Sequence, residues 1–196
     1  MYIKIHPENP PERQLQKTAR ILDNGGVIAY PTDTAYALGC HMGDKQALER
    51  IISIRQLDRK HHFTLMCRDL SDIGTYAHFG TPVYRFLKAH TPGPFTFILK
   101  ATKTVPRRLK HPKKRTIGLR IPDHPVAQAI LETFGDPIMT TTLILPGREY
   151  PLQDPEIIKK TLSEELDLIV DGYEMGGRGV TTVINLTSGL PVLVRE

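Results

Sequence analysis

Apolar and polar positions alternate along the chain in two periods, one typical of helices and one typical of strands. Leu15, Ala19 and Leu22 recur at helical spacing, as do the apolar positions of residues 47–52. Further helices are expected at residues 70–77, 83–89, 126–134 and 156–162. Short apolar or alternating runs predict strands at residues 27–30, 63–67, 95–99, 116–121, 138–145, 168–170, 181–186 and 192–194. Because strands interleave with helices throughout, we expect an α/β fold with a mixed sheet.

Proline, glycine and one aspartate mark where several predicted helices begin and end. Pro10-Pro11 suits a first helical turn, and Gly25-Gly26 ends that helix. Asp44 is a good N-cap for the second helix, and Gly135 ends the helix at 126–134. No shift in composition marks a boundary, so the chain is expected to form a single domain over residues 1–196.

The composition is that of an ordinary globular protein. Of its 196 residues, 40% are hydrophobic and 24% are charged, which excludes a disordered chain. Cys40 and Cys67 are too few for a disulfide framework, and this usage fits a reducing cytosol. The first residues lack the apolar core of a signal peptide, and no apolar run approaches the roughly 20 residues of a membrane span. We therefore expect a cytoplasmic protein with no membrane partner.

Positive charge is concentrated in one segment. The chain has 26 Lys and Arg against 21 Asp and Glu, a net charge of +5. Residues 100–122 contain nine basic residues and no acidic one, and without them 17 basic residues face 21 acidic ones. The segment suits a solvated loop, a nucleic-acid contact or the wall of a nucleotide cleft, and the lack of acids favours a phosphate-bearing partner. Its basic residues are Lys100, Lys103, Arg107, Arg108, Lys110, Lys113, Lys114, Arg115 and Arg120.

A polar turn follows the strand predicted at residues 27–30. Pro31 ends the hydrogen-bonding ladder, and Thr32, Asp33 and Thr34 place three polar side chains at the strand end. Strand ends in α/β sheets commonly bind ligands. A simpler interpretation, and the one that composition favours, is a turn in which Asp33 bonds its neighbours.

Cations cluster where the second helix ends. Arg55 suits the negative end of the helix dipole, but it equally suits a clamp for phosphate or carboxylate. His61-His62 lack a further His or Cys at ligand spacing, so no metal site is expected. Threonines at 140–142 and 181–182 fit β-propensity or a set of hydroxyls that binds a polar ligand. Neither a P-loop nor a Gly-x-Ser-x-Gly elbow occurs.

Four segments together resemble the threonylcarbamoyl-AMP synthase superfamily, the YrdC/YciO proteins, and the similarity runs in register over nearly the whole chain. Residues 55–57 and 63–70 look closest to the YciO branch. The four segments are Val27–Gly39, Pro92-Gly93-Pro94-Phe95-Thr96, Ile117–Pro125 with its Arg-x-Pro-x-His-Pro pattern, and Thr181–Leu186.

The resemblance implies a twisted mixed sheet flanked by helices, with a positively charged concave cleft. It implies that ATP with a divalent ion such as Mg²⁺, L-threonine and bicarbonate are substrates, condensed to threonylcarbamoyl-AMP for the t6A modification of tRNA. No permanent metal is implied. It also implies affinity for double-stranded RNA, which we assign to the basic segment, at Arg107, Arg108, Lys110, Lys113, Lys114 and Arg115.

Individual site residues follow from the same resemblance. Thr32, Arg120 and Thr181 match the threonine pocket, where Arg120 would hold the carboxylate. Arg55 and Thr142 match the catalytic positions and also contact the nucleotide. Further nucleotide contacts are expected from Arg59, Thr116 and Arg195.

Two motifs depart from those of the synthases. Their Lys-x-Arg is Arg55-Gln56-Leu57 here, and their Ser-x-Asn is Thr142-Leu143-Ile144. One cation and one amide are thus replaced by apolar side chains, at a site where preorganised charges drive the chemistry. The leading hypothesis is a YciO-branch protein that binds ATP or an adenylate, and RNA, with altered synthase chemistry. The alternatives are a fully active synthase, in which Arg59 or Lys60 compensates, a hydrolase of such adenylates, and a non-enzymatic RNA-binding module.

Overall fold

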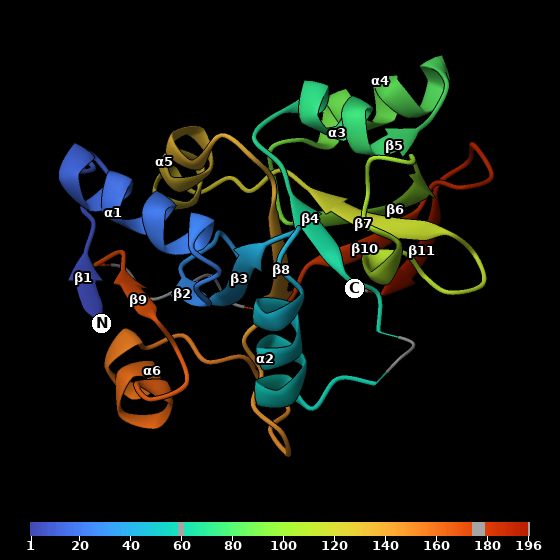
Figure 1. The fold of residues 1–196 in the computed structure, drawn as a ribbon. Helices are drawn as coiled ribbons and strands as arrows, with labels where there is room; N and C mark the ends of the chain where they lie inside the picture. The colour runs from blue at the N-terminus through green and yellow to red at the C-terminus, as the bar shows by residue number, and fades with distance from the viewer. Residues whose placement is uncertain (59–60, 174–178, 196) are drawn as a thin grey trace.

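One continuous twisted sheet runs through the protein in the computed structural model, which describes residues 1–58, 61–173 and 179–195. Figure 1 shows the sheet running from β1 at one end of the molecule to β11 at the other. The strand order is β1-β9-β2-β3-β8-β4-β7-β6-β10-β11, with β5 paired to β6 outside this path. The strands are β1 (Tyr2–Lys4), β2 (Ile28–Tyr30), β3 (Ala37–His41), β4 (Thr64–Met66), β5 (Ala77–His78), β6 (Phe95–Ala101), β7 (Thr116–Arg120), β8 (Ile138–Thr142), β9 (Leu168–Asp171), β10 (Thr182–Asn185) and β11 (Val192–Arg195).

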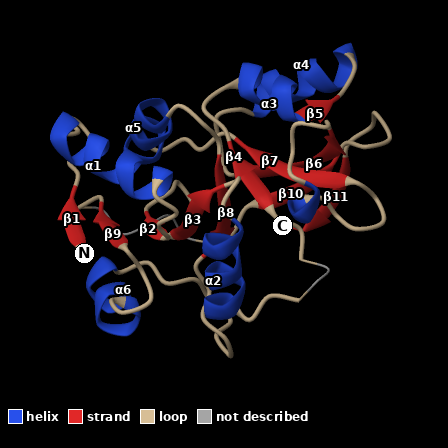
Figure 2. Cartoon of the chain, viewed as in Figure 1, coloured by secondary structure: helices blue, strands red, loops and turns tan. Residues whose placement is uncertain are grey.

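The sheet is mixed, as the interleaved pattern predicts. Pairs β1/β9, β2/β9, β4/β7 and β6/β10 are parallel, while the other neighbouring pairs are antiparallel. The six α-helices found among the described residues flank this sheet (Figure 2). They are α1 (Glu12–Asp23), α2 (Lys45–Arg55), α3 (Leu70–Tyr76), α4 (Thr81–His90), α5 (Pro125–Phe134) and α6 (Pro155–Leu162), and a short 3₁₀ helix, η1, spans Arg107–Leu109.

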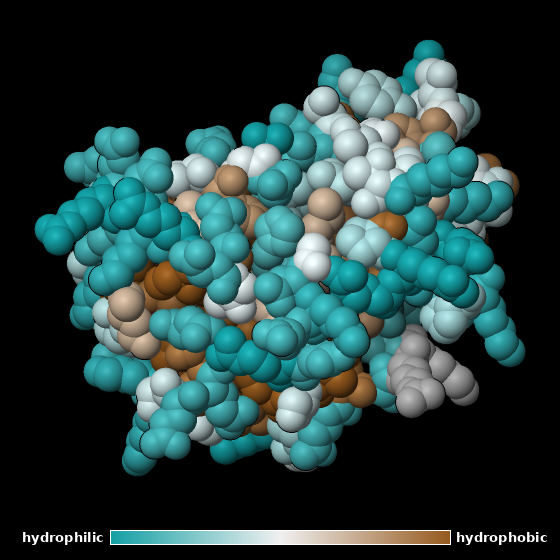
Figure 3. Space-filling view, in the orientation of Figure 1, coloured by the Kyte–Doolittle hydropathy of each residue, from teal (hydrophilic) through white to brown (hydrophobic). Residues whose placement is uncertain are grey.

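Buried side chains form two clusters, one on each face of the sheet. Along β2, Ala29 belongs to one cluster, while Ile28 and Tyr30 belong to the other, as alternation along a strand requires. Helices α1 and α5 cover the second cluster, and the apolar faces of α2, α3, α4 and α6 join the first. Figure 3 shows hydrophilic side chains over much of one face, with apolar residues visible in recesses between them. No helix among the described residues is long and apolar enough to cross a membrane.

Helix ends lie where their capping residues predict. The Asp44 carboxylate accepts a hydrogen bond from the Ala47 amide at 2.8 Å and caps α2. Gly135 ends α5 with φ of 86°, a left-handed conformation that glycine adopts without steric cost. Between β6 and β7 the basic segment forms a loop that contains η1.

Three strands were not predicted from the sequence: β1, β3 and β5. Of these, β3 matters most for the position of the polar turn. It pairs with both β2 and β8, so the turn between β2 and β3 lies near the centre of the sheet. Its residues Ala37–Cys40 are buried, so the alternation that marks a half-exposed strand is missing. β5 has two residues and carries no periodic signal.

Candidate functional site

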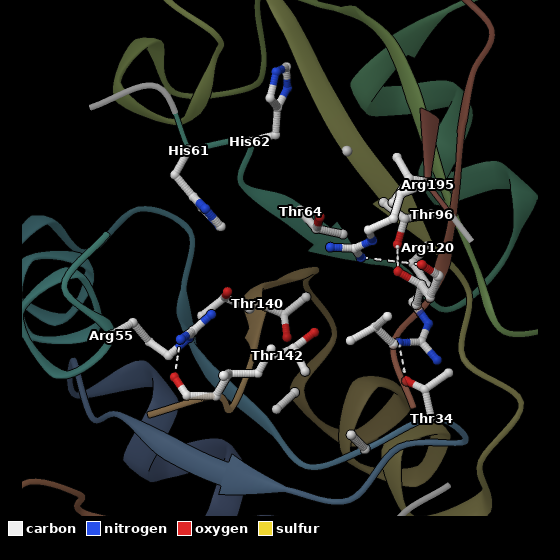
Figure 4. Close-up of a pocket in the computed structure, with 18 of the residues that line it drawn as sticks. Thr34, Arg55, His61, His62, Thr64, Thr96, Arg120, Thr140, Thr142 and Arg195 are labelled. Atoms are coloured by element: carbon white, nitrogen blue, oxygen red, sulfur yellow. Dashed lines mark hydrogen bonds between the residues drawn. The ribbon is translucent and has the colours of Figure 1, made fainter. Parts of the chain in front are cut away.

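A cleft of about 600 Å³ is lined by residues of β3, β4, β6, β7, β8, β10 and β11. Figure 4 shows Arg55 on one side of it and Arg120 with Arg195 on the other. Three arginines and Asp58 are the described residues of fixed charge that line it. Hydroxyl groups supply most of the remaining polar surface, from Thr32, Thr34, Thr64, Thr96, Thr140, Thr141, Thr142 and Thr181.

The turn after β2 is organised by Thr32. Its hydroxyl donates to the carbonyl of Ala35 at 2.6 Å and accepts from the amides of Thr34 and Ala35 at 3.2 Å each. The side chain is buried, at 1% exposure. The interpretation of this segment as a turn is therefore right, but Thr32 makes the bonds that we had assigned to Asp33.

Asp33 instead reaches across the cleft wall to Arg120. The Arg120 guanidinium lies 2.5 Å from the Asp33 carboxylate and donates a second bond to the Thr34 hydroxyl at 3.1 Å. Both side chains are nearly buried, at 6% and 12% exposure. Burial lowers the pKa of the Arg120 guanidinium, and the Asp33 carboxylate opposes that shift. Arg120 Nε and Asp33 Oδ2 are buried without a partner among the described residues, and Arg120 lines the cleft whereas Asp33 does not.

Arg55, the last residue of α2, has a different environment. Its guanidinium donates to the backbone carbonyl of Ile144, and its Nε is buried without a partner among the described residues. Burial lowers the pKa of this guanidinium, and no carboxylate in the described chain forms an ion pair with it. The cleft therefore receives from Arg55 a positive charge that the described residues do not neutralise.

Two imidazoles stand between the cleft and the basic segment. His61 and His62 both line the cleft, and His62 stacks on His111 with ring centres 4.7 Å apart. Burial, reinforced by Arg55, lowers the pKa of His61 to about 4. Burial and the neighbouring His111 also lower the pKa of His62. No cluster of three or more His, Cys, Asp or Glu among the described residues could hold a metal ion.

Paired hydroxyls join the strands around the cleft. Thr96 on β6 donates to Thr181 at 2.9 Å, and the Tyr30 hydroxyl donates to Thr140 on β8 at 3.0 Å. Arg195 on β11 donates to the carbonyl of Thr181 at 3.2 Å. These bonds fix β6, β8, β10 and β11 around one space, although their residues lie far apart in the sequence.

Most of the predicted site residues meet in this cleft. Thr32, Arg55, Arg120, Thr142, Thr181 and Arg195 all line it. Thr116 is the exception: it is buried at the start of β7 and is not among the lining residues, whereas Gly118 on the same strand is. Arg59 lies outside the described residues.

The basic segment divides into two groups. Arg107, Arg108, Lys110 and Arg115 line a second cavity, next to the cleft. Lys113 and Lys114 are exposed and do not line it. This division could not be predicted from the sequence, because all six residues belong to one acid-free run.

Several cleft residues were not predicted as site residues. Thr64, Thr96 and His61 line the cleft, as do Leu57 and Ile144, the two positions that depart from the synthase motifs. Thr96 could have been predicted as a site residue, because it ends the Pro-Gly-Pro-x-Thr segment. Thr64 did not, since a single threonine in a strand is ordinary β-propensity.

A family model matches residues 20–196, nine-tenths of the chain: the Sua5/YciO/YrdC model, described as telomere recombination. The chain belongs to the Sua5/YciO/YrdC family. Among its family relatives, YciO of Escherichia coli K12 is 52% identical over 195 residues, covering 100% of this chain and 94% of YciO. A threonylcarbamoyl-AMP synthase from Nitrosococcus oceani is 32% identical over 163 residues, covering 83% of this chain and 87% of the synthase.

Solved structures of the family share the fold. The crystal structure of E. coli YciO superposes with a TM-score of 0.94, covering 100% of this chain and 95% of that one. Sua5 of P. abyssi complexed with L-threonine, 25% identical, superposes with a TM-score of 0.89 and covers 100% of this chain but 57% of its own. The expected twisted mixed sheet flanked by helices is therefore confirmed.

Proposed function

We propose that the cleft binds ATP or a related adenylate beside a threonine-like amino acid, and that its synthase chemistry is altered. The observation that carries this proposal is Arg55, a buried cation that lines the cleft, has an unpartnered Nε and forms no ion pair within the described chain. Such a group favours phosphate, which arginine binds through directed, charge-assisted hydrogen bonds. Thr142 and Arg195 line the same space and would contact the nucleotide.

The opposite side of the cleft suits an amino acid. Arg120 Nε and Asp33 Oδ2 are a donor and an acceptor in one ion pair, both unpartnered among the described residues. Arg120 lines the cleft and would hold the carboxylate of an amino acid, while Asp33, which is not among the lining residues, keeps the guanidinium oriented. Hydroxyls of Thr32 and Thr181 lie in the same cleft. The L-threonine complex of Sua5 supports this assignment by similarity.

Two apolar side chains reduce the set of groups available for catalysis. Leu57 and Ile144 line the cleft at the positions where the synthase motifs have a cation and an amide. Adenylyl transfer depends on charges that face the developing charge on phosphorus, and one preorganised donor is worth about 10²–10³-fold in rate. We therefore expect the cleft to bind the nucleotide but to catalyse the synthase reaction slowly, with bicarbonate and Mg²⁺-ATP as weak substrates.

Calorimetry with ATP and with threonylcarbamoyl-AMP tests the proposed site. If neither ligand binds at millimolar concentration, the cleft is not an adenylate site. Release of pyrophosphate that depends on threonine and bicarbonate tests the alternative of a fully active synthase. A rate equal to the blank would exclude that alternative, and rescue of cells that lack their own synthase would support it.

Double-stranded RNA or tRNA is a second candidate partner, for which the exposed part of the basic segment argues. Lys113 and Lys114 are exposed, and the segment contains no acidic residue. Binding that depends on phosphate contacts weakens with salt, with a slope of about −0.9 per contact for duplexes. The measurement is the affinity for an RNA duplex against salt concentration, and a slope unchanged in Lys113→Gln/Lys114→Gln would exclude these contacts.

A further inference from the structure

A second cavity of about 600 Å³ adjoins the cleft and has an unusually uniform lining. No acidic residue of the described chain lines it, although the protein as a whole has nearly as many acids as bases. The cavity is thus a local concentration of positive charge, which raises the potential felt by an anion. The cations that line it are Lys45, Arg107, Arg108, Lys110 and Arg115.

Four of these charges are not neutralised within the described chain. Lys45 lies 3.6 Å from Glu49 on the exposed surface of α2, but no carboxylate among the described residues pairs with the other four cations. Arg108 donates to the backbone carbonyls of Met42 and Gly43, and Lys110 donates to that of Thr102 at 2.6 Å. Hydrogen bonds to carbonyl oxygens fix the orientation of a cation but do not neutralise its charge, which remains available to an anion.

The backbone of the basic segment holds this arrangement in place. His111 Nδ1 accepts from the amides of Lys113 and Lys114 at 3.3 and 3.1 Å, and the Arg115 amide donates to the His111 carbonyl at 2.9 Å. Arg115 itself has φ of 56°, a conformation uncommon for a residue with a side chain. Arg115 is thereby among the residues that line the cavity, while Lys113 and Lys114 remain outside it.

A wall of imidazoles separates the cavity from the cleft. His61 lines both spaces, and the stacked pair of His62 and His111 has one ring in the lining of each. The lowered pKa values of His61 and His62 keep these rings neutral near pH 7. The uncharged rings of His61 and His62 therefore lie between the cations of the cavity and the arginines of the cleft, and the two spaces can hold separate ligands.

We propose that this cavity is a second anion site, which binds a small ligand with several phosphate groups. Arginine forks suit phosphate oxygens, and several converging cations suit adjacent phosphates of one compact ligand. The phosphates of a nucleic-acid duplex are spread along the outside of a wide rod, whereas these cations converge on one cavity of about 600 Å³, a size that suits a small ligand. The site does not depend on the function proposed for the cleft.

Calorimetry of the whole protein with inorganic tripolyphosphate, without divalent ions, tests the proposal. The variant Arg107→Gln/Arg115→Gln removes two charges from the cavity, and neither side chain makes a hydrogen bond with a described residue. It should weaken binding at least tenfold, since hydrogen bonds to charged groups are individually strong. Lys113→Gln/Lys114→Gln is the matched control, because it removes the same charge from the same loop, and it should change the affinity by less than about twofold.

Four results would overturn the proposal. Equal weakening by both pairs would indicate a diffuse field rather than a site, and absence of binding at millimolar concentration would indicate no site at all. Loss of tripolyphosphate binding in Arg55→Met would place the ligand in the cleft.

A short RNA duplex serves as the second probe. If Arg107→Gln/Arg115→Gln weakens the duplex and spares tripolyphosphate, the cavity belongs to an RNA surface and the proposal is also wrong. Should the double variant fold poorly, Arg107→Gln alone should still weaken tripolyphosphate by about threefold.

Discussion

Arg120 and Arg55 lie on opposite sides of one cleft, and both are cations whose pKa burial lowers, yet their surroundings differ. Arg120 has a carboxylate 2.5 Å away and a hydroxyl at 3.1 Å. Arg55 has a backbone carbonyl, which orients the guanidinium without neutralising it. A cation that is already held by an ion pair suits the single carboxylate of an amino acid, whereas an uncompensated cation suits a more highly charged anion. The comparison is in line with the proposal that the cleft takes an amino acid on one side and a nucleotide on the other.

The largest expected effect comes from removing the carboxylate on the Arg120 side. Asp33→Ala leaves a buried guanidinium unpaired, so the free energy of unfolding in urea should fall by about 3–5 kcal/mol. The double variant Asp33→Ala/Arg120→Met removes the charge as well and should recover most of that loss. A loss below about 1 kcal/mol in the single variant would mean that Arg120 is compensated elsewhere, and the contrast between the two arginines would fail.

Restoring polar groups on the Arg55 side should produce the next largest change. Leu57→Arg/Ile144→Asn supplies the cation and the amide of the synthase motifs. Pyrophosphate release dependent on threonine and bicarbonate should rise by about 100-fold or more, because each preorganised donor stabilises developing charge. Leu57→Met/Ile144→Leu, which keeps both positions apolar, is the control. A restored variant that is no faster than the original would show that these two groups do not limit turnover.

Removing the charge of Arg55 tests the contrast between the two arginines through the affinity for ATP. Arg55→Met should raise the Kd for ATP by about 10–100-fold, as expected for lost hydrogen bonds from a charged group. Arg50→Met is the matched control on the same helix, since Arg50 pairs with Asp167 at 2.7 Å outside the cleft. An ATP affinity that is the same in both variants would remove Arg55 from the nucleotide site.

The smallest effect concerns His61 and pH. The folded protein holds the pKa of His61 at about 4, below its ordinary value near 6.5. Below pH 6.5 the unfolded chain therefore binds more protons, and stability falls as the pH drops toward 4. Allowing for partial exposure, His61→Gln should reduce the loss of unfolding free energy between pH 7 and pH 5 by about 1 kcal/mol. An equal pH dependence of stability in the original protein and in His61→Gln would contradict the prediction.

The sequence predicted the helices and most strands because their apolar positions recur with a clear period. It did not predict β3, whose residues are buried without alternation. The resemblance to a family identified six residues of the cleft, since it relates motifs that are distant in the chain. It assigned Thr116 to the nucleotide, but Thr116 is not among the residues that line the cleft. The pairing of Asp33 with Arg120 also escaped prediction, because it joins positions 87 residues apart and depends on the register of the sheet.

Two features of the cleft affect how the protein folds during its synthesis. One is the hydrogen bond between the hydroxyls of Thr96 and Thr181, and the other is the position of Arg195 in β11. One wall of the cleft consists of Thr181, Val183, Val194 and Arg195, which pair or pack with segments translated far earlier. Contacts of such long sequence separation form late, because the loop between them must first close. A nascent chain on the ribosome therefore cannot complete the cleft until β10 and β11 emerge. A ligand that binds the finished cleft would stabilise these two strands, so their protection from proteolysis would report both folding and binding.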